Sequence, residues 1–120
     1  MTPLQLSRVI ADAALARKAR AVVRIDLRGR TTLADYFVIC EGDTDRQVRS
    51  IANHMSELAA RSGVHPLSRA GLEEGSWACL DFDSVIAHVF LPGERAYYDL
   101  ESLWGPARRV RPRPAAAVGS

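Results

Sequence analysis

Residues 75–104 read GSWACLDFDSVIAHVFLPGERAYYDLESLW, and this stretch decides the fold. It contains two strand-like runs, Trp77 to Phe82 and Val85 to Leu91, separated by a polar turn at Asp83-Ser84. Both runs alternate in the way that is typical of β-strands. Pro92-Gly93 predicts the end of the second strand, because proline donates no ladder hydrogen bond and glycine allows a turn.

The alternation assigns each side chain of the two runs to one face of a strand. In the first run Trp77, Cys79 and Asp81 share a face, and the residues between them share the other. In the second run Ile86, His88 and Phe90 share a face in the same way. We therefore predict a hairpin that begins at Trp77.

Carboxylates are concentrated in the same part of the chain. Between Glu73 and Glu101 seven acids accompany a single arginine, which gives a local net charge of −6. Tryptophan, tyrosine and histidine interleaved with carboxylates favour docking on a basic protein surface. An ordinary hairpin with a solvated acidic face is the alternative interpretation.

Length and composition indicate one globular domain. The 120 residues are 48% hydrophobic and 25% charged, which is enough for a modest core. No apolar run reaches the length of a membrane span, and the first residues lack the order of a secretory signal. Cys40 and Cys79 lie in apolar strand-like runs, so we predict two buried thiols in a cytoplasmic protein.

The end of the chain differs from the rest in charge. The formal net charge of +2 becomes about −2 without the four arginines that follow Trp104 in an acid-free stretch, and a body of that sign binds polyanions poorly. We predict a folded domain over residues 1–107 and a disordered Arg/Pro/Ala-rich tail over residues 108–120. Such a tail is compatible with a minor contact to RNA and equally with a solubilising role.

The first half of the chain shows helix and strand patterns in turn. Thr2 followed by Pro3 predicts a helix that starts with a hydroxyl cap and runs to about Lys18. Residues 21–27 and 34–40 have strand patterns, and the second of these is predicted to be a central strand.

A second helix and a short strand precede the hairpin. Thr44 with Gln47 has the capping-box pattern, and Ser62-Gly63 predicts the helix end. A short strand is expected within residues 65–70, and a single helical turn within residues 98–104. The resulting order predicts a single-domain α/β sandwich with a mixed β-sheet.

Two patterns hint at enzymatic chemistry. Asp81 and Asp83 have the spacing of carboxylates that share a metal, and Gly42-Asp43-Thr44 precedes a helix as phosphate-binding turns do. Together they would suit a nucleotidyltransferase. Against it, Asp43 puts negative charge where a phosphate would lie, and no third carboxylate is evident. Cys40 with His88 lacks an activating third group, so we predict no enzyme activity, no metal and no cofactor.

Four motifs in order closely resemble the ribosomal silencing factor family, also called the Iojap family. They are Ala34 to Ile39 (ADYFVI), Gly42 to Val48 (GDTDRQV), Trp77 to Phe90 with its WxxLD and HVF parts, and Tyr98 to Trp104 (YDLESLW). The resemblance covers about residues 4–107. The chain departs from the family pattern at Ala70 and at Asp83-Ser84.

The resemblance implies a fold like that of a nucleotidyltransferase without its catalytic residues. It also implies binding to the large ribosomal subunit through ribosomal protein uL-fourteen at the intersubunit face, which sterically blocks joining of the small subunit and represses translation. A large-subunit assembly factor is the remaining alternative. This role is compatible with a monomer or a homodimer. It is also compatible with a minor contact between the tail and ribosomal RNA. The candidate partner-binding residues are Trp77, Asp81, His88, Phe90, Tyr98, Asp99, Glu101 and Trp104.

Overall fold

The computed structural model describes residues 1–94 and 108–110, and there the predicted order of elements holds through the hairpin. The two helices are α1 (Pro3–Ala16) and α2 (Asp45–Arg61). The strands are β1 (Arg20–Asp26), β2 (Tyr36–Glu41), β3 (Ser68–Ala70), β4 (Trp77–Asp81), β5 (Val85–Phe90) and β6 (Arg108–Arg109). Of these, only β6 was not expected. The predicted helical turn at residues 98–104 lies outside the described residues.

Both helices begin at the predicted threonine caps. The Oγ1 atom of Thr2 accepts from the Gln5 backbone nitrogen at 3.1 Å, and the Gln5 side chain accepts from the Thr2 nitrogen at 2.8 Å. At α2 the Thr44 hydroxyl accepts from the Gln47 nitrogen at 3.1 Å, while the Gln47 side chain accepts from Asp43. These bonds satisfy amide donors that have no partner within a helix, so local sequence decides where each helix starts.

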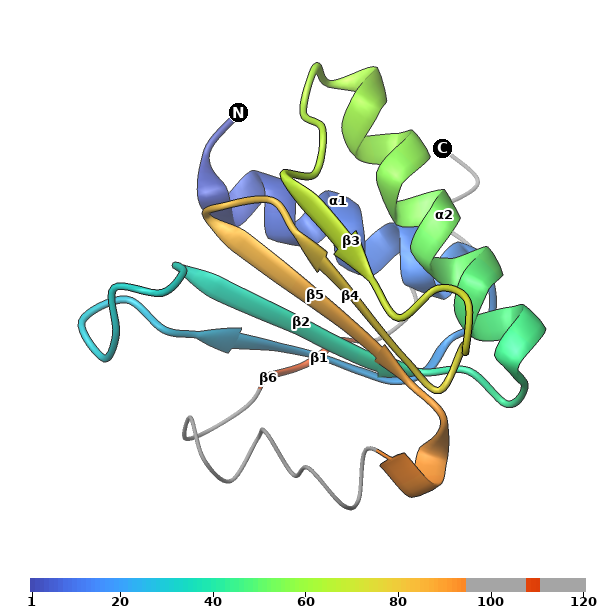
Figure 1. Ribbon diagram of the computed structural model, residues 1–120. Helices are drawn as coiled ribbons and strands as arrows, with labels where there is room; N and C mark the ends of the chain where they lie inside the picture. Colours follow the sequence, from blue (N-terminus) through green and yellow to red (C-terminus); the bar gives the residue numbers. More distant parts are fainter. Residues whose placement is uncertain (95–107, 111–120) are drawn as a thin grey trace, which may run out of the picture.

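The six strands form one mixed sheet in the order β3-β4-β5-β2-β1-β6 (Figure 1). β2 is central, as predicted, and it runs parallel to β5 and antiparallel to β1. The hairpin partners β4 and β5 are antiparallel, with Trp77 opposite Phe90 and Cys79 opposite His88. All six residues of β5 are buried, in keeping with its place between β4 and β2 in the interior of the sheet.

α1 and α2 cover one face of the sheet (Figure 1). Their inner residues, such as Ile10, Ile51 and Met55, form the main core with alternate strand residues that include Leu80 and Val89. The predicted alternation is confirmed, because Trp77 and Phe90 lie on the opposite face. No helix within the described residues is long and apolar enough to cross a membrane.

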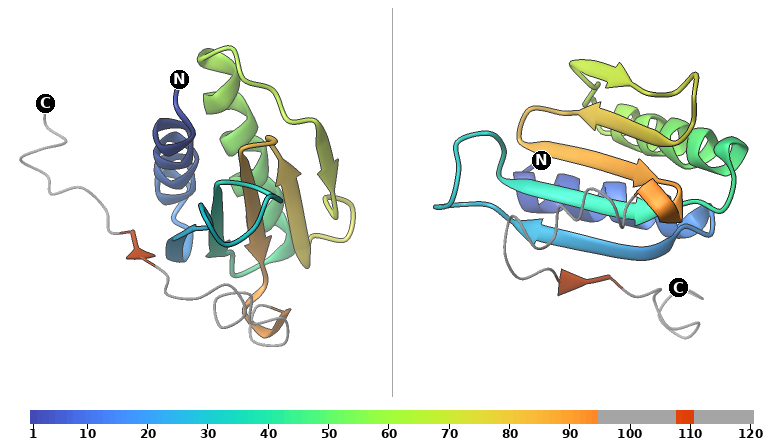
Figure 2. Two further views of the ribbon diagram at one scale, coloured as in Figure 1. Left: turned by 90° about the vertical axis from the view of Figure 1, so that its left-hand side faces the viewer. Right: turned by 60° about the horizontal axis from the view of Figure 1, so that its bottom comes forward.

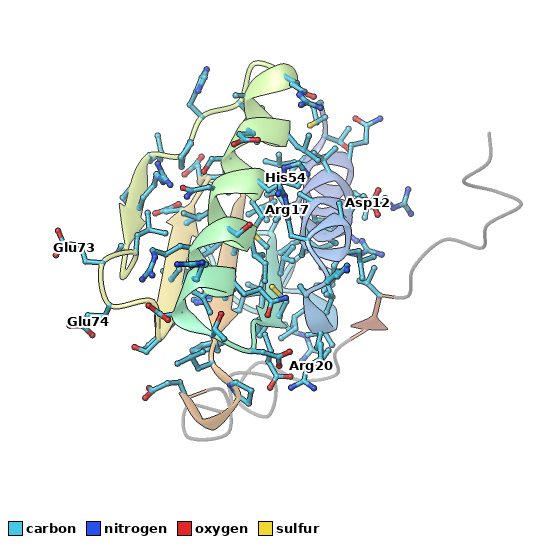
Figure 3. The ribbon with its side chains drawn as sticks, turned by 90° about the vertical axis from the view of Figure 1, so that its right-hand side faces the viewer. Asp12, Arg17, Arg20, His54, Glu73 and Glu74 are labelled. Carbon is cyan, nitrogen blue, oxygen red and sulfur yellow. The ribbon has the colours of Figure 1, made fainter. Side chains whose placement is uncertain are left out.

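The helices also meet at their polar surfaces. The Arg17 guanidinium lies 3.5 Å from the Nδ1 atom of His54, and Figure 3 shows these two side chains pointing toward each other between α1 and α2. His54 Nδ1 is also 3.5 Å from Glu57 Oε2. This contact lies on the helix layer, on the other side of the sheet from Trp77 and Phe90.

The prediction that the chain is disordered from residue 108 is wrong for residues 108–110. Arg108 and Arg109 form β6, which pairs antiparallel with Arg24 and Val23 of β1. The backbone nitrogen of Val110 donates to the Val22 carbonyl at 2.7 Å. A ladder of backbone hydrogen bonds needs no apolar side chains, and the free edge of β1 offers the donors and acceptors. The sheet therefore extends two residues beyond the predicted domain boundary, to Arg109.

Candidate partner-binding face

The sheet face opposite the helices carries a second apolar cluster. Its buried members come from three strands and the loop between β1 and β2, and Trp77 and Cys79 of β4 pack against them. The right-hand view of Figure 2 looks onto this face, with α1 and α2 behind the strands. The buried members are Val23, Ile25, Leu27, Ala34, Phe37, Ile39, Ile86 and Phe90.

Trp77 is half-buried at the start of β4. Its ring stacks on Phe90, its cross-strand partner, with the centroids 5.0 Å apart and the planes 28° apart. The Nε1 atom donates to Nδ1 of His88 at 3.1 Å. The indole is therefore packed against Phe90 and oriented by a hydrogen bond, while part of it remains accessible.

His88 lies beneath this indole and is only 7% exposed. An indole nitrogen can only donate, so His88 Nδ1 is the acceptor and the ring is neutral with its hydrogen on Nε2. Nε2 is buried and has no hydrogen-bond partner among the described residues. Burial lowers the pKa of His88 from 6.5 to about 4, because the charged ring would lose its hydration.

The neighbours of His88 are aromatic. Phe37 of β2 meets the imidazole edge-on, with centroids 4.9 Å apart, and Phe90 stacks on it with centroids 6.0 Å apart. A buried donor without an acceptor costs about 1–3 kcal/mol. The Nε2 donor of His88 therefore carries such a cost.

Asp81 shapes the turn of the hairpin. Its Oδ1 atom accepts from the backbone nitrogen of Asp83 at 2.8 Å, and Asp83 adopts a φ of 72°. A carboxylate that accepts from the backbone two residues on is an ordinary turn-forming arrangement. Asp81 thus has a structural role and, being half-buried on the same side of β4 as Trp77, also borders the second cluster.

An acidic loop leads directly into Trp77. Glu73 and Glu74 are exposed, and Figure 3 shows both side chains pointing away from the body. Arg49 of α2 holds the loop, since its guanidinium donates to the Glu73 carbonyl at 3.3 Å and pairs with Asp45 at 2.7 Å. At Gly75, where φ is +72°, a Cβ atom would lie 2.7 Å from Cβ of Asp45. The close approach of the loop to α2 therefore requires glycine at this position.

The residues considered for enzyme chemistry have other contacts. The Gln47 side chain accepts a hydrogen bond from the Asp43 backbone nitrogen, and the Asp43 carboxylate pairs with Arg20 at 2.8 Å. A phosphate at this turn would therefore meet a negative charge and a backbone nitrogen that is already hydrogen-bonded. Within residues 1–94 and 108–110 no three His, Cys, Asp or Glu side chains gather as metal ligands would.

The two cysteines lie on opposite faces of the sheet and are free thiols. Cys40 is buried in the main core as predicted, but Cys79 is only half-buried, which corrects the second prediction. Burial, followed by the charge of Asp81, raises the pKa of the Cys79 thiol. Cys79 lies on the same strand and the same face as Trp77, and neither α1 nor α2 covers that face, which accounts for the partial exposure.

The structure brings three of the predicted partner-binding residues into contact and places a fourth beside them. Trp77, His88 and Phe90 form one aromatic group, and Asp81 lies on the same side of β4. Sequence reasoning missed Phe37, whose alternation with Ile39 within β2 was the available signal. The remaining predicted residues, Tyr98, Asp99, Glu101 and Trp104, lie outside the described part of the chain.

Comparisons with known proteins agree with this fold. The chain is 36% identical over 110 residues to the ribosomal silencing factor RsfS of Halalkalibacterium halodurans, covering 92% of this chain and 94% of the relative. A crystal structure of a protein from Chromobacterium violaceum superposes with a TM-score of 0.86 at 31% identity over the full length of both chains. A more distant relative is the mouse protein named mitochondrial assembly of ribosomal large subunit protein 1, 31% identical over 90 residues, covering 72% of this chain and 39% of the relative. The family model described as "Ribosomal silencing factor during starvation" matches residues 1–118, and the chain belongs to this family.

Proposed function

We propose that this protein is a cytoplasmic translation repressor that binds the large ribosomal subunit through ribosomal protein uL-fourteen and blocks joining of the small subunit. Membership of the ribosomal silencing factor family supports a role at the ribosome. The name of the mouse relative supports the large subunit as the partner.

One observation carries the choice of docking surface. Trp77 is partly exposed on the sheet face opposite α1 and α2, and it is oriented by His88 and Phe90. Rigid, partly exposed aromatic residues are the usual anchors of protein interfaces. Trp77 therefore supplies the anchor of the proposed interface, and the buried members of the second apolar cluster hold it in place.

The rim of the proposed interface is acidic. Glu73 and Glu74 lie on the loop before Trp77, and Asp81 follows it on the same side of β4. Rim charges act mainly on association rate and salt dependence, so this arrangement suits a partner surface rich in lysine and arginine. Charge complementarity would steer the protein to a basic ribosomal protein.

The proposed activity is steric and involves no catalysis or cofactor. A protein of this size that occupies a subunit interface excludes the other subunit by its presence alone. Inhibition is then reversible, needs no nucleotide and leaves the ribosome unmodified. The alternative of a nucleotidyltransferase that uses Asp81 and Asp83 is not favoured, because the Asp81 carboxylate accepts the turn hydrogen bond from Asp83.

Co-sedimentation with isolated subunits tests this proposal. We expect the protein to pellet with large subunits and to remain in the supernatant with small subunits. Trp77→Ala should weaken binding by about 2 kcal/mol or more, as truncation of an interface anchor does. Glu57→Ala, which removes an exposed acid on the helix layer, is the matched control and should bind normally. Equal binding of wild type and Trp77→Ala, with both proteins folded, would contradict the proposed surface.

Large-subunit assembly is a second candidate, favoured by the name of the mouse relative. A contact of the arginine-rich tail with ribosomal RNA would suit that role. Because β6 belongs to the sheet, the tail must be removed after Val110 rather than after Ala107. A large loss of affinity on removal of residues 111–120 would favour the assembly role, whereas unchanged affinity favours binding through the sheet face.

A further inference from the structure

The polar ring of His88 has an unusual position in an otherwise apolar cluster. It is surrounded by Phe37, Phe90 and Trp77, and its Nε2 atom has no partner among the described residues. A buried polar group that lacks a partner calls for an explanation. An apolar side chain of similar size would fill this space without losing hydration, so packing alone does not account for a histidine here.

Among the described residues, the one polar contact of this ring is with Trp77. Nδ1 accepts from the indole nitrogen at 3.1 Å, across neighbouring strands whose register places Trp77 opposite Phe90 and His88 opposite Cys79. Trp77 is thus a diagonal neighbour of His88, and the hydrogen bond selects one rotation of the indole about its side-chain bonds. Stacking on Phe90 constrains the plane of the ring but does not by itself decide which edge of the indole faces inward.

We propose that His88 is a positioning residue, whose Nδ1 atom holds the indole of Trp77 in the orientation that the large-subunit partner recognises. His88 is itself too buried to reach a partner, which revises its predicted role as a contact residue. The inference rests on the proposed function and deepens it. An anchor that is already oriented loses less side-chain freedom on binding, and this raises affinity.

Two substitutions of nearly equal shape test whether the hydrogen-bond acceptor of His88, rather than the shape of its side chain, orients Trp77. His88→Asn keeps an oxygen at the position of Nδ1 and can still accept from Trp77. His88→Leu has the same branching without an acceptor. Neither variant removes a residue of the main core, and both are checked for folding by circular dichroism and urea unfolding.

The first measurement uses the free protein and does not depend on any partner. In a Trp104→Phe background Trp77 is the only tryptophan, so emission wavelength and acrylamide quenching report on its indole. We expect His88→Leu to shift the emission and increase quenching, and His88→Asn to resemble the parent. Identical spectra and quenching in the His88→Leu variant would overturn the inference.

The second measurement is affinity for large subunits in the background that retains both tryptophans. His88→Leu should bind roughly 3- to 10-fold more weakly, as expected when one ordinary hydrogen bond is lost, and His88→Asn within about twofold of wild type. Equal weakening in both variants, or none in His88→Leu, would refute the positioning role. If wild type itself fails to bind large subunits, the proposed function fails, while the fluorescence result still decides whether His88 orients Trp77.

Discussion

Burial of a neutral histidine makes the stability of this protein depend on pH. The pKa of His88 is lowered from 6.5 to about 4 by burial, so the folded protein resists protonation of a ring that the unfolded chain protonates readily. Between these two values the unfolded state binds more protons than the folded state. The contribution of His88 to stability is therefore fully present above pH 6.5 and is lost as the pH falls toward 4.

The size of this loss follows from the shift. A difference of 2.5 pKa units between 6.5 and about 4 corresponds to about 3 kcal/mol in total, of which about 2 kcal/mol is lost between pH 7.5 and pH 5. Asp26 contributes little in this range, because the hydrogen bond from Arg28 lowers its pKa to about 2 and the carboxylate stays ionised. The window from pH 7.5 to 5 therefore covers most of the stability change expected from His88 and little of that expected from Asp26.

Urea unfolding at the two pH values measures the effect directly. Wild type should lose about 2 kcal/mol more stability between pH 7.5 and 5 than His88→Leu, in which all other groups remain. Subtracting the loss of stability in His88→Leu from the loss in wild type cancels the contribution of every other titrating side chain. An equal loss in both would show that the His88 ring is solvated or charged in the folded protein, and the buried neutral ring described above would then be wrong.

Three further outcomes follow from the geometry. Gly75→Ala should destabilise the protein by about 3 kcal/mol or more, because it adds a steric clash to a strained left-handed backbone. Gly29→Ala is also at positive φ but has open space around it, so it should cost about 1 kcal/mol. Urea unfolding compares the two variants. Truncation after Ala107 removes β6 and should lower the thermal unfolding midpoint, while truncation after Val110 should leave it unchanged. Binding of wild type to large subunits should weaken between low and high salt, as measured by sedimentation, and invariance to salt would argue against the acidic rim around Trp77.

Patterns of short range predicted most of the fold. The caps at Thr2 and Thr44 and the alternation in residues 77–90 each depend on neighbours within a few positions, and all three are present in the structure. The order of strands depends on contacts between distant segments. The parallel pairing of β2 with β5 spans more than forty residues, and no local pattern encodes it.

Three residues of the candidate partner-binding face were named from the sequence, but their arrangement was not predicted. Trp77, His88 and Phe90 were expected to contact the partner. How these three side chains lie relative to one another follows only from the register of β4 and β5. That register makes His88 a diagonal neighbour of Trp77, and the parallel pairing with β2 brings Phe37 beside it. The strand at Arg108–Arg109 was missed for a different reason, because edge pairing uses the backbone and leaves no apolar pattern.

The central claim is that occupation of one site on the large subunit is sufficient for repression. Titration of the protein into purified large subunits, followed by addition of small subunits and light scattering, tests it most directly. Joining should decrease in proportion to the protein added, reach full inhibition at about one protein per large subunit without nucleotide, and recover on dilution. Full inhibition at far less than one equivalent, increasing with time of incubation, would show turnover and contradict the steric account.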